Sequence, residues 1–220
     1  CERRGGGSLT ALPIIETQAQ NIAAYIPTNL ISITDGQIYL SPSLFELGVL
    51  PAVDVAKSVS RVGGKAQRAA YRAVTADLKL AYAQFEELES FARFGARLDD
   101  STKKTLEHGR RIRACLMQAQ SAPVPVVAQI AVLIALSEQL FDSVPLERMP
   151  QAEQAVREAA TSHPKLLQER LNATAKLSEA DRHALIDMAR AVLRGFQAHA
   201  QAVTAPRVGA SHQPTDKASS

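Results

Sequence analysis

The chain has 220 residues and 46% of them are hydrophobic, so it is long enough to bury one or two cores. Its net charge of +3 is small and its aromatic content is only 5%, which argues against a nucleic-acid partner bound by a basic and aromatic surface. The histidines and cysteines lack metal-ligand spacing, and no run of eighteen apolar residues could cross a membrane. We therefore expect a soluble chain without a metal site.

The first part of the chain has the pattern of an α/β domain. Residues 9–17 form a short apolar run that predicts a buried strand, residues 30–33 are a second apolar stretch, and residues 37–40 predict another strand. Ser41 should cap a brief helix before an extended, buried run resumes at residue 51.

Several parts of such a domain are missing from the sequence. Fewer than four strands cannot form a stable open sheet, and the chain begins at Cys1 with a charged triplet and three glycines, so we expect the C-terminal piece of a longer protein. The nearest match to a phosphate-binding loop is Gly63-Gly64-Lys65, which lacks the first glycine and has Ala66 where a hydroxyl should hold Mg²⁺. We therefore predict that this chain has no phosphate-binding loop.

From residue 64 onward, the hydrophobic period becomes helical. The longest apolar stripe steps by three and four residues over six turns and comprises Ala70, Val74, Leu78, Ala81, Phe85, Leu88 and Ala92. Four further helices are expected, at residues 106–116, 126–141, 149–159 and from Ser178 onward. Residues 126–141 are apolar nearly all round and should form the central helix. The pattern predicts an all-α bundle over residues 64–200 and a disordered tail over residues 201–220.

The densest basic segment lies on the second of these helices. It comprises Lys103, Lys104, Arg110, Arg111 and Arg113. We interpret it as a solvated helix face rather than a track for phosphate groups.

One segment combines several reactive side chains at the end of an apolar run. Residues 51–61 read PAVDVAKSVSR and place two hydroxyls, a carboxylate and the guanidinium of Arg61 close together. An arginine in this position is more often a structural salt-bridge partner. Its planar fork could also reach across an interface and neutralise charge on a transferring phosphoryl group.

This segment resembles the signature that alpha and beta subunits of rotary ATPases share. Two upstream stretches, GGGSLTALPIIETQ and IPTNLISITDGQIYL, resemble the alpha subunit of F-type ATP synthases nearly residue for residue. The resemblance continues through SVSRVGGKAQ and AQFEELESFARFGARLDD. It is strong over residues 5–140 and fades toward residue 197.

The resemblance implies a fold and a biological context. Residues 1–63 would supply the last strands of a RecA-like nucleotide-binding domain, followed by the C-terminal helical bundle. Such alpha subunits alternate with beta subunits around a rotating gamma subunit, at the cytoplasmic face of the bacterial inner membrane, and touch the membrane only through the complex. The chain would be a non-catalytic, regulatory subunit for ATP synthesis and hydrolysis coupled to proton or sodium transport. ATP or ADP with Mg would bind the intact complex, and none is expected on this chain alone.

The resemblance also implies the roles of particular residues. Arg61 corresponds to the arginine finger that enters the catalytic site of the neighbouring beta subunit. Ser32 and Gly36 match positions that line the same interface near the phosphate.

A second, non-catalytic nucleotide site is implied as well. Gln118 and Gln120 match two glutamines that contact its adenine, and Pro51 belongs to the same site. The family usually has an arginine where this chain has Leu50 and an aromatic residue where it has Ser121. Both departures should weaken nucleotide binding at this site, and they suggest a divergent or second-copy synthase, coupled to protons or sodium ions.

Two alternatives remain open on the sequence. The chain could be a truncated remnant whose helical bundle is only an interaction module. It could also be a beta-type subunit or the non-catalytic subunit of a vacuolar-type ATPase. Beta subunits carry an acidic, Pro-rich segment where this chain has Pro27-Thr28-Asn29, and the stretch GGGSLTALP argues against the vacuolar type.

Overall fold

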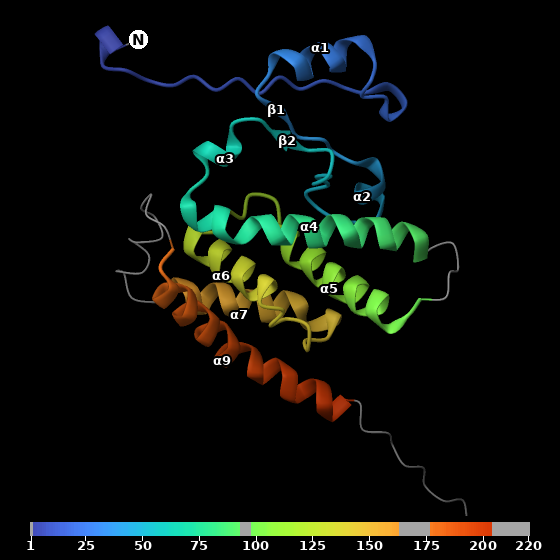
Figure 1. Ribbon diagram of the computed structural model, residues 1–220, viewed down its shortest axis with the longest axis vertical. Helices are drawn as coiled ribbons and strands as arrows, with labels where there is room; N and C mark the ends of the chain where they lie inside the picture. The colour runs from blue at the N-terminus through green and yellow to red at the C-terminus, as the bar shows by residue number, and fades with distance from the viewer. Residues whose placement is uncertain (1, 93–97, 163–176, 204–220) are drawn as a thin grey trace, which may run out of the picture.

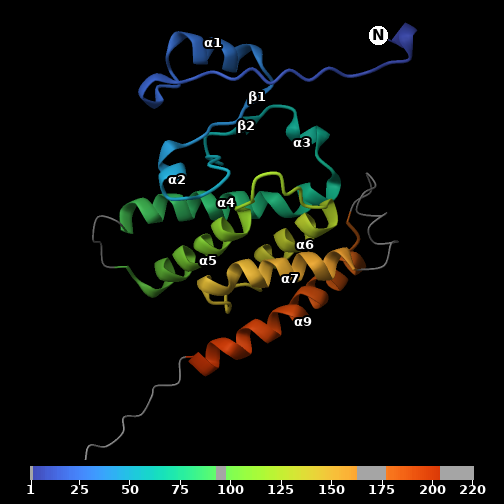
Figure 2. The same cartoon turned by 180° about the vertical axis from the view of Figure 1, so that it is seen from behind.

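A computed structural model of the chain describes residues 2–92, 98–162 and 177–203. An irregular N-terminal region lies above a bundle of helices, and Figure 1 shows α4 at the top of that bundle, next to this region. The view from behind in Figure 2 shows the same order, with α9 on the side of the bundle away from the N-terminal region.

The N-terminal region consists of short elements joined by extended chain. They are η1 (Glu2–Arg4), η2 (Gln18–Gln20), α1 (Tyr25–Ile33), β1 (Gly36–Gln37), α2 (Pro42–Glu46), β2 (Val59–Ser60) and α3 (Gly63–Ala66). The strands β1 and β2 pair antiparallel, with Gly36 opposite Ser60. A separate, isolated bridge pairs Leu40 with Val53.

The strand predictions for this region were only partly right. Residues 9–17 form no strand, and Leu9 and Ile14 are 97% and 98% exposed, because no neighbouring strand in the described residues offers them backbone partners. Residues 30–33 lie in the helix α1. The strand predicted at residues 37–40 is reduced to β1 and the Leu40 bridge.

The predicted cap of the next helix is confirmed. The Ser41 hydroxyl accepts a hydrogen bond from the Leu44 N–H, and Pro42 is the first residue of α2. Gly48 follows the helix with a φ of 73°, a left-handed conformation that favours glycine. The sequence signals for the start and end of this helix are therefore reliable, even though most of the predicted strands around it do not form.

The bundle is helical, as the sequence predicts. It contains α4 (Ala69–Ala92), α5 (Asp100–Leu116), α6 (Val126–Ser137), η3 (Leu146–Arg148), α7 (Met149–Thr161) and α9 (Glu179–Val203). The helix α6 packs against α4, α7 and α9 and buries eight of its side chains, so the prediction of a central helix is confirmed. The helix α9 continues through Val203, so the predicted tail is wrong at residues 201–203, and residues 204–220 lie outside the described residues.

The helices α4 and α5 pack closely together at a glycine. A Cβ atom built on Gly109 would lie 2.0 Å from Cγ of Phe85, which is fully buried in the core. Only a residue without a side chain leaves room for the ring at this crossing. Gly109 is therefore required by packing, although it lies inside a helix where glycine is unfavourable.

The basic segment of α5 is not a uniformly solvated face, which corrects the prediction. Lys103, Lys104 and Arg110 are exposed, but Arg111 is buried and Arg113 is half-buried. Arg113 forms an ion pair of 2.8 Å with Glu89 and lies over the ring of Phe85. Both arginines bury their long apolar stems within the bundle: Arg113 pairs with Glu89 on α4, and Arg111 donates through Nε to the Val144 carbonyl.

The described residues contain no helix that is long and apolar enough to cross a membrane. In the same part of the chain, no group of three or more His, Cys, Asp and Glu side chains is arranged to hold a metal ion. Burial raises the pKa of the Cys115 thiol, so its reactive thiolate form is rare.

Candidate functional site

Arg61 directly follows β2, and its side chain lies on the end of α1. Its backbone N–H donates to the Asp35 carbonyl over 2.8 Å. The guanidinium donates through Nη2 to the carbonyls of Ile31 (2.6 Å), Ser32 (3.3 Å) and Thr34. Carbonyls at a helix C-terminus have no partner in the helix and carry partial negative charge, so they suit a guanidinium. Backbone oxygens, rather than an acid, therefore orient the Arg61 side chain.

Arg61 is exposed and forms no ion pair with any residue that the structure describes. A guanidinium has five N–H donors, and only those of Nη2 make hydrogen bonds to the described chain. The Nε and Nη1 groups of Arg61 thus make no hydrogen bond within the described part of the chain.

Close approach of two backbones sets the geometry around Arg61. A Cβ atom on Gly36 would lie 2.3 Å from the Val59 carbonyl oxygen and 2.9 Å from Cα of Ser60, so only glycine allows β1 to pair with β2 here. This pairing places Arg61 beside the end of α1. The structure therefore brings together Arg61, Gly36 and the backbone of Ser32, the three residues that the motif singled out for this interface.

The two hydroxyls in this region have different partners. The exposed Ser32 hydroxyl donates within its own helix, to the Asn29 carbonyl over 2.7 Å. The Thr34 hydroxyl lies 2.7 Å from the Leu30 carbonyl and 3.1 Å from the Gly36 carbonyl, so it ties the end of α1 to β1. Sequence reasoning did not single out Thr34, because its role depends on carbonyls that only the folded loop brings close.

The segment before Arg61 is anchored to the bundle. Lys57 pairs with Asp54 over 3.2 Å, and the Ser58 hydroxyl accepts from the Tyr39 N–H over 3.0 Å. Val55 packs against the helical core. Burial raises the pKa of the nearby Glu86 on α4, and the Asp54 carboxylate raises it further. The segment before Arg61 therefore packs against the bundle at Val55, and its Asp54 carboxylate repels that of Glu86 on α4.

The residues predicted for the non-catalytic nucleotide lie in two adjoining loops. The Gln118 N–H donates to the Leu50 carbonyl over 2.9 Å, which places the loop after α5 against the cis Leu50–Pro51 peptide. The Gln118 side chain closes its own loop by donating to the Ala122 carbonyl. Gln120 is exposed and makes no side-chain hydrogen bond within the described residues. Gln118, Leu50 and Pro51 are thus brought together, and Gln120 is left open to solvent.

Both parts of the chain match known protein families. Residues 67–192 match the family described as "ATP synthase alpha/beta chain, C terminal domain", and residues 1–60 match "ATP synthase alpha/beta family, nucleotide-binding domain". The chain belongs to the ATP synthase alpha/beta family. Its fold is part of a nucleotide-binding domain followed by an all-helical C-terminal domain, as the sequence predicts.

Within that family, the chain is similar to alpha subunits. It is 70% identical over 217 residues to ATP synthase subunit alpha 2 of Albidiferax ferrireducens, covering 99% of this chain and 41% of that protein. It is 75% identical over 193 residues to subunit alpha 2 of Polaromonas naphthalenivorans, covering 88% and 37%. It is 71% identical over 192 residues to subunit alpha 1 of a Marinomonas species, covering 87% and 38%. The predicted alpha-type identity is confirmed, and the chain spans about two fifths of the length of these relatives.

Proposed function

We propose that this chain acts within a non-catalytic alpha subunit of a rotary F-type ATP synthase and supplies Arg61 to the catalytic site of a neighbouring beta subunit. The observation that carries the proposal is an exposed guanidinium without an ion pair in the described chain, oriented by backbone carbonyls beside Ser32 and Gly36. The subunit would contact the membrane only through the complex, whose gamma subunit couples ATP synthesis and hydrolysis to transport of protons or sodium ions.

The chemistry of Arg61 follows from its position. Phosphoryl transfer spreads negative charge over the oxygens of the transferring group, and a guanidinium can donate to two of them at once. The carbonyls at the end of α1 hold the side chain near one orientation before the partner arrives, which lowers the entropy lost on engagement. ATP with Mg²⁺ would be held by the partner subunit and would supply the phosphoryl group.

The segment after Arg61 supports a non-catalytic role for this chain. Gly63 and Lys65 lie in the single-turn helix α3, where a phosphate-binding loop would need free glycine N–H groups. The Gly63 N–H donates to the Ser60 hydroxyl over 2.9 Å instead. A Cβ atom on Gly63 would lie 2.7 Å from that hydroxyl oxygen, so this glycine serves the turn.

Reconstitution tests the proposal. The full-length subunit that contains this sequence is purified alone, with a beta-type and a gamma-type subunit, and in the complete mixture. We expect ATP hydrolysis only where the ring forms, because the catalytic phosphate site belongs to the partner. Hydrolysis by the alpha-type subunit alone, or an active beta–gamma assembly without it, would contradict the proposal.

A second part of the proposal concerns the non-catalytic nucleotide, for which Gln118, Gln120 and Pro51 would contact the adenine. Leu50 is 47% exposed beside Gln118 and offers no hydrogen bond or charge to a nucleotide. Replacing it with arginine in the full-length subunit is expected to raise the affinity for ATP about tenfold, because one charge-assisted hydrogen bond is gained.

Equilibrium titration with ATP measures this affinity. Leu47→Arg is the matched control, since Leu47 is similarly exposed at 53% but does not lie against Gln118. Equal affinities for the two variants would show that Leu50 is not next to the adenine.

A further inference from the structure

A cavity that is open to solvent and lined in part by charged side chains lies on the helical bundle, apart from both sites above. Its volume is about 650 Å³, and it is formed by α4, α5 and the turn that follows α6. Cavities of roughly 300–1,000 Å³ are typical of small-molecule sites. None of its lining residues belongs to the Arg61 region or to the Gln118 loop.

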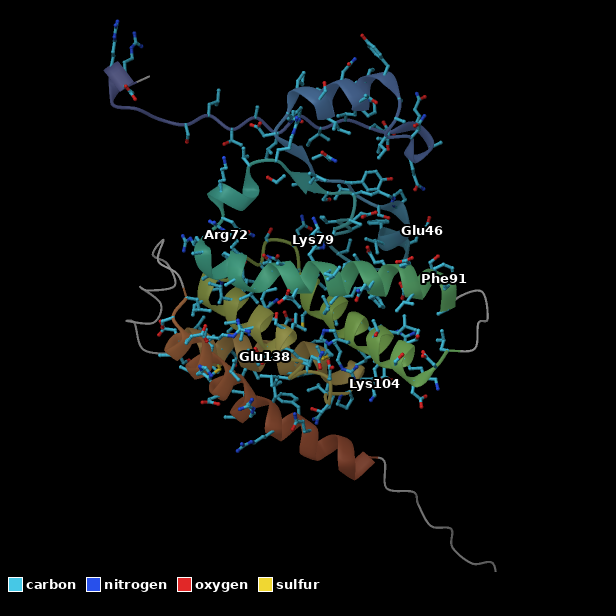
Figure 3. All side chains as sticks on the ribbon, viewed as in Figure 1. Glu46, Arg72, Lys79, Phe91, Lys104 and Glu138 are labelled. Carbon is cyan, nitrogen blue, oxygen red and sulfur yellow. The ribbon has the colours of Figure 1, made fainter. Side chains whose placement is uncertain are left out.

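Three basic side chains line the α5 side of this cavity. Lys104, His108 and Arg111 are spaced by four and three residues, so they share one face of the helix. Figure 3 labels Lys104 on α5, on the part of the bundle away from the N-terminal region. Lys104 is exposed and forms no ion pair in the described part of the chain. The face thus runs from an exposed ammonium group to a buried guanidinium.

Arg111 is the deepest of the three, and its hydrogen bonding is incomplete. The residue is only 8% exposed, and its Nε donates to the Val144 carbonyl over 3.1 Å. The nearest carboxylate is that of Glu107, 3.8 Å from Nη1, which is too long for a hydrogen bond. The Nη donors of Arg111 therefore have no hydrogen-bond acceptor among the described residues. These donors are not among the fully buried polar atoms, so they are open to solvent at the wall of the cavity, where an acceptor can reach them.

The imidazole ring of His108 lines the same side of the cavity as Arg111. Its Nδ1 lies 2.8 Å from Oδ1 of Asp142, and its side chain is 13% exposed. A carboxylate accepts, so Nδ1 carries a proton and Nε2 is left for a ligand.

Of the carboxylates that line the cavity, one is hydrogen-bonded to a lining residue and another is largely exposed to solvent. Asp142 is engaged by His108, and the Glu107 side chain is 60% exposed. Asp77, on the α4 wall, has no partner within the described residues. An anion in the cavity is therefore attracted to α5 and opposed by one free carboxylate on α4.

We propose that this cavity is a binding site for a small oxyanion of the phosphate type, held by Arg111, His108 and Lys104. The oxyanion supplies the acceptors that the Arg111 Nη groups lack, and its charge is balanced by the Lys104 ammonium and Arg111 guanidinium groups. The site does not depend on the role of Arg61, because its residues and its cavity are separate from that region.

The test is a titration of the purified 220-residue chain with inorganic phosphate at constant ionic strength, followed by calorimetry and by NMR shifts of the His108 ring. Lys104→Gln is expected to weaken phosphate binding about tenfold, since one charged donor is removed. Asp77→Asn is expected to strengthen binding, because the opposing carboxylate is lost. Lys103→Gln is the matched control: it makes the same charge change one residue away, where the lysine pairs with Asp100 and does not line the cavity.

These variants separate a defined site from general attraction to a basic helix. Saturable binding that falls with Lys104→Gln, rises with Asp77→Asn and is unchanged by Lys103→Gln supports the proposal. Absence of saturable binding, or equal effects of Lys103→Gln and Lys104→Gln, overturns it.

Discussion

Replacing Arg61 with alanine is expected to lower ATP hydrolysis by the assembled complex about 10³-fold or more, the usual cost of losing an arginine finger. The loss should appear in kcat, because the guanidinium acts on charge that develops only in the transition state. Assembly should be unaffected, since the Arg61 side chain contacts only backbone carbonyls within the described part of its own chain. Steady-state hydrolysis by the purified complex measures the effect.

Two variants show whether the geometry of the guanidinium matters. Arg61→Lys keeps the charge but loses the planar fork, so it should recover only a small part of the activity. Arg72→Ala is the control, because Arg72 is an exposed arginine at the start of α4 (Figure 3) whose Nη2 donates only to the Gln67 carbonyl. A normal rate for Arg61→Ala, or an equal loss for Arg72→Ala, would refute the assignment.

Gly109→Ala is expected to destabilise the bundle by about 1–3 kcal/mol or more, because the added methyl group overpacks the core. The Cβ would lie 2.0 Å from Cγ and 2.3 Å from Cβ of the fully buried Phe85. Either the ring leaves its position or α4 and α5 separate. This cost outweighs the gain in helix propensity, which is about 0.5–1 kcal/mol for glycine to alanine. The free energy of unfolding of the purified chain, from denaturant titration, measures the balance.

Gly195→Ala is the matched control for that substitution. Gly195 lies in α9 with nothing within 4 Å of its Cβ position, so the same change should be neutral or stabilising by about 0.5–1 kcal/mol. Equal effects of the two glycine substitutions would show that packing at Gly109 is not the cause.

The helices could be predicted because their signals are local. The apolar stripe on α4 matches the buried side chains Ala70, Val74, Leu78 and Phe85, and the all-apolar run became the buried helix α6. Each helix buries its stripe against another helix within the same chain. Periodicity alone therefore defined most of the bundle.

The strands could not be predicted in the same way, because a strand needs a neighbour. The run at residues 9–17 has strand-like composition, but no described segment pairs with it and Leu9 is 97% exposed.

The burial of charged residues was equally difficult to predict. Arg111 lies next to the exposed Arg110, and only the packing of α5 against its neighbours decides which of the two is buried.

For the candidate site, the sequence predicted which residues take part but not how they contact one another. The family resemblance identified Arg61, Ser32 and Gly36, and the structure brings them together. It did not indicate that the Ile31 and Thr34 carbonyls orient the guanidinium. Every residue has a backbone carbonyl, so the residue types do not show which carbonyls will accept from Arg61. The cavity beside Arg111 could likewise not be predicted from the sequence, because it forms only where α4 and α5 pack against each other.

Binding of a transition-state analogue tests the trans action of Arg61 most directly. The assembled complex is titrated with ADP and fluoroaluminate at the catalytic site, and separately with ATP, for the native sequence and for Arg61→Ala. We expect Arg61→Ala to weaken analogue binding about 10²-fold or more while ATP binding changes little, because the finger stabilises the transition state rather than the ground state. Unchanged binding of the analogue would contradict the role proposed for Arg61.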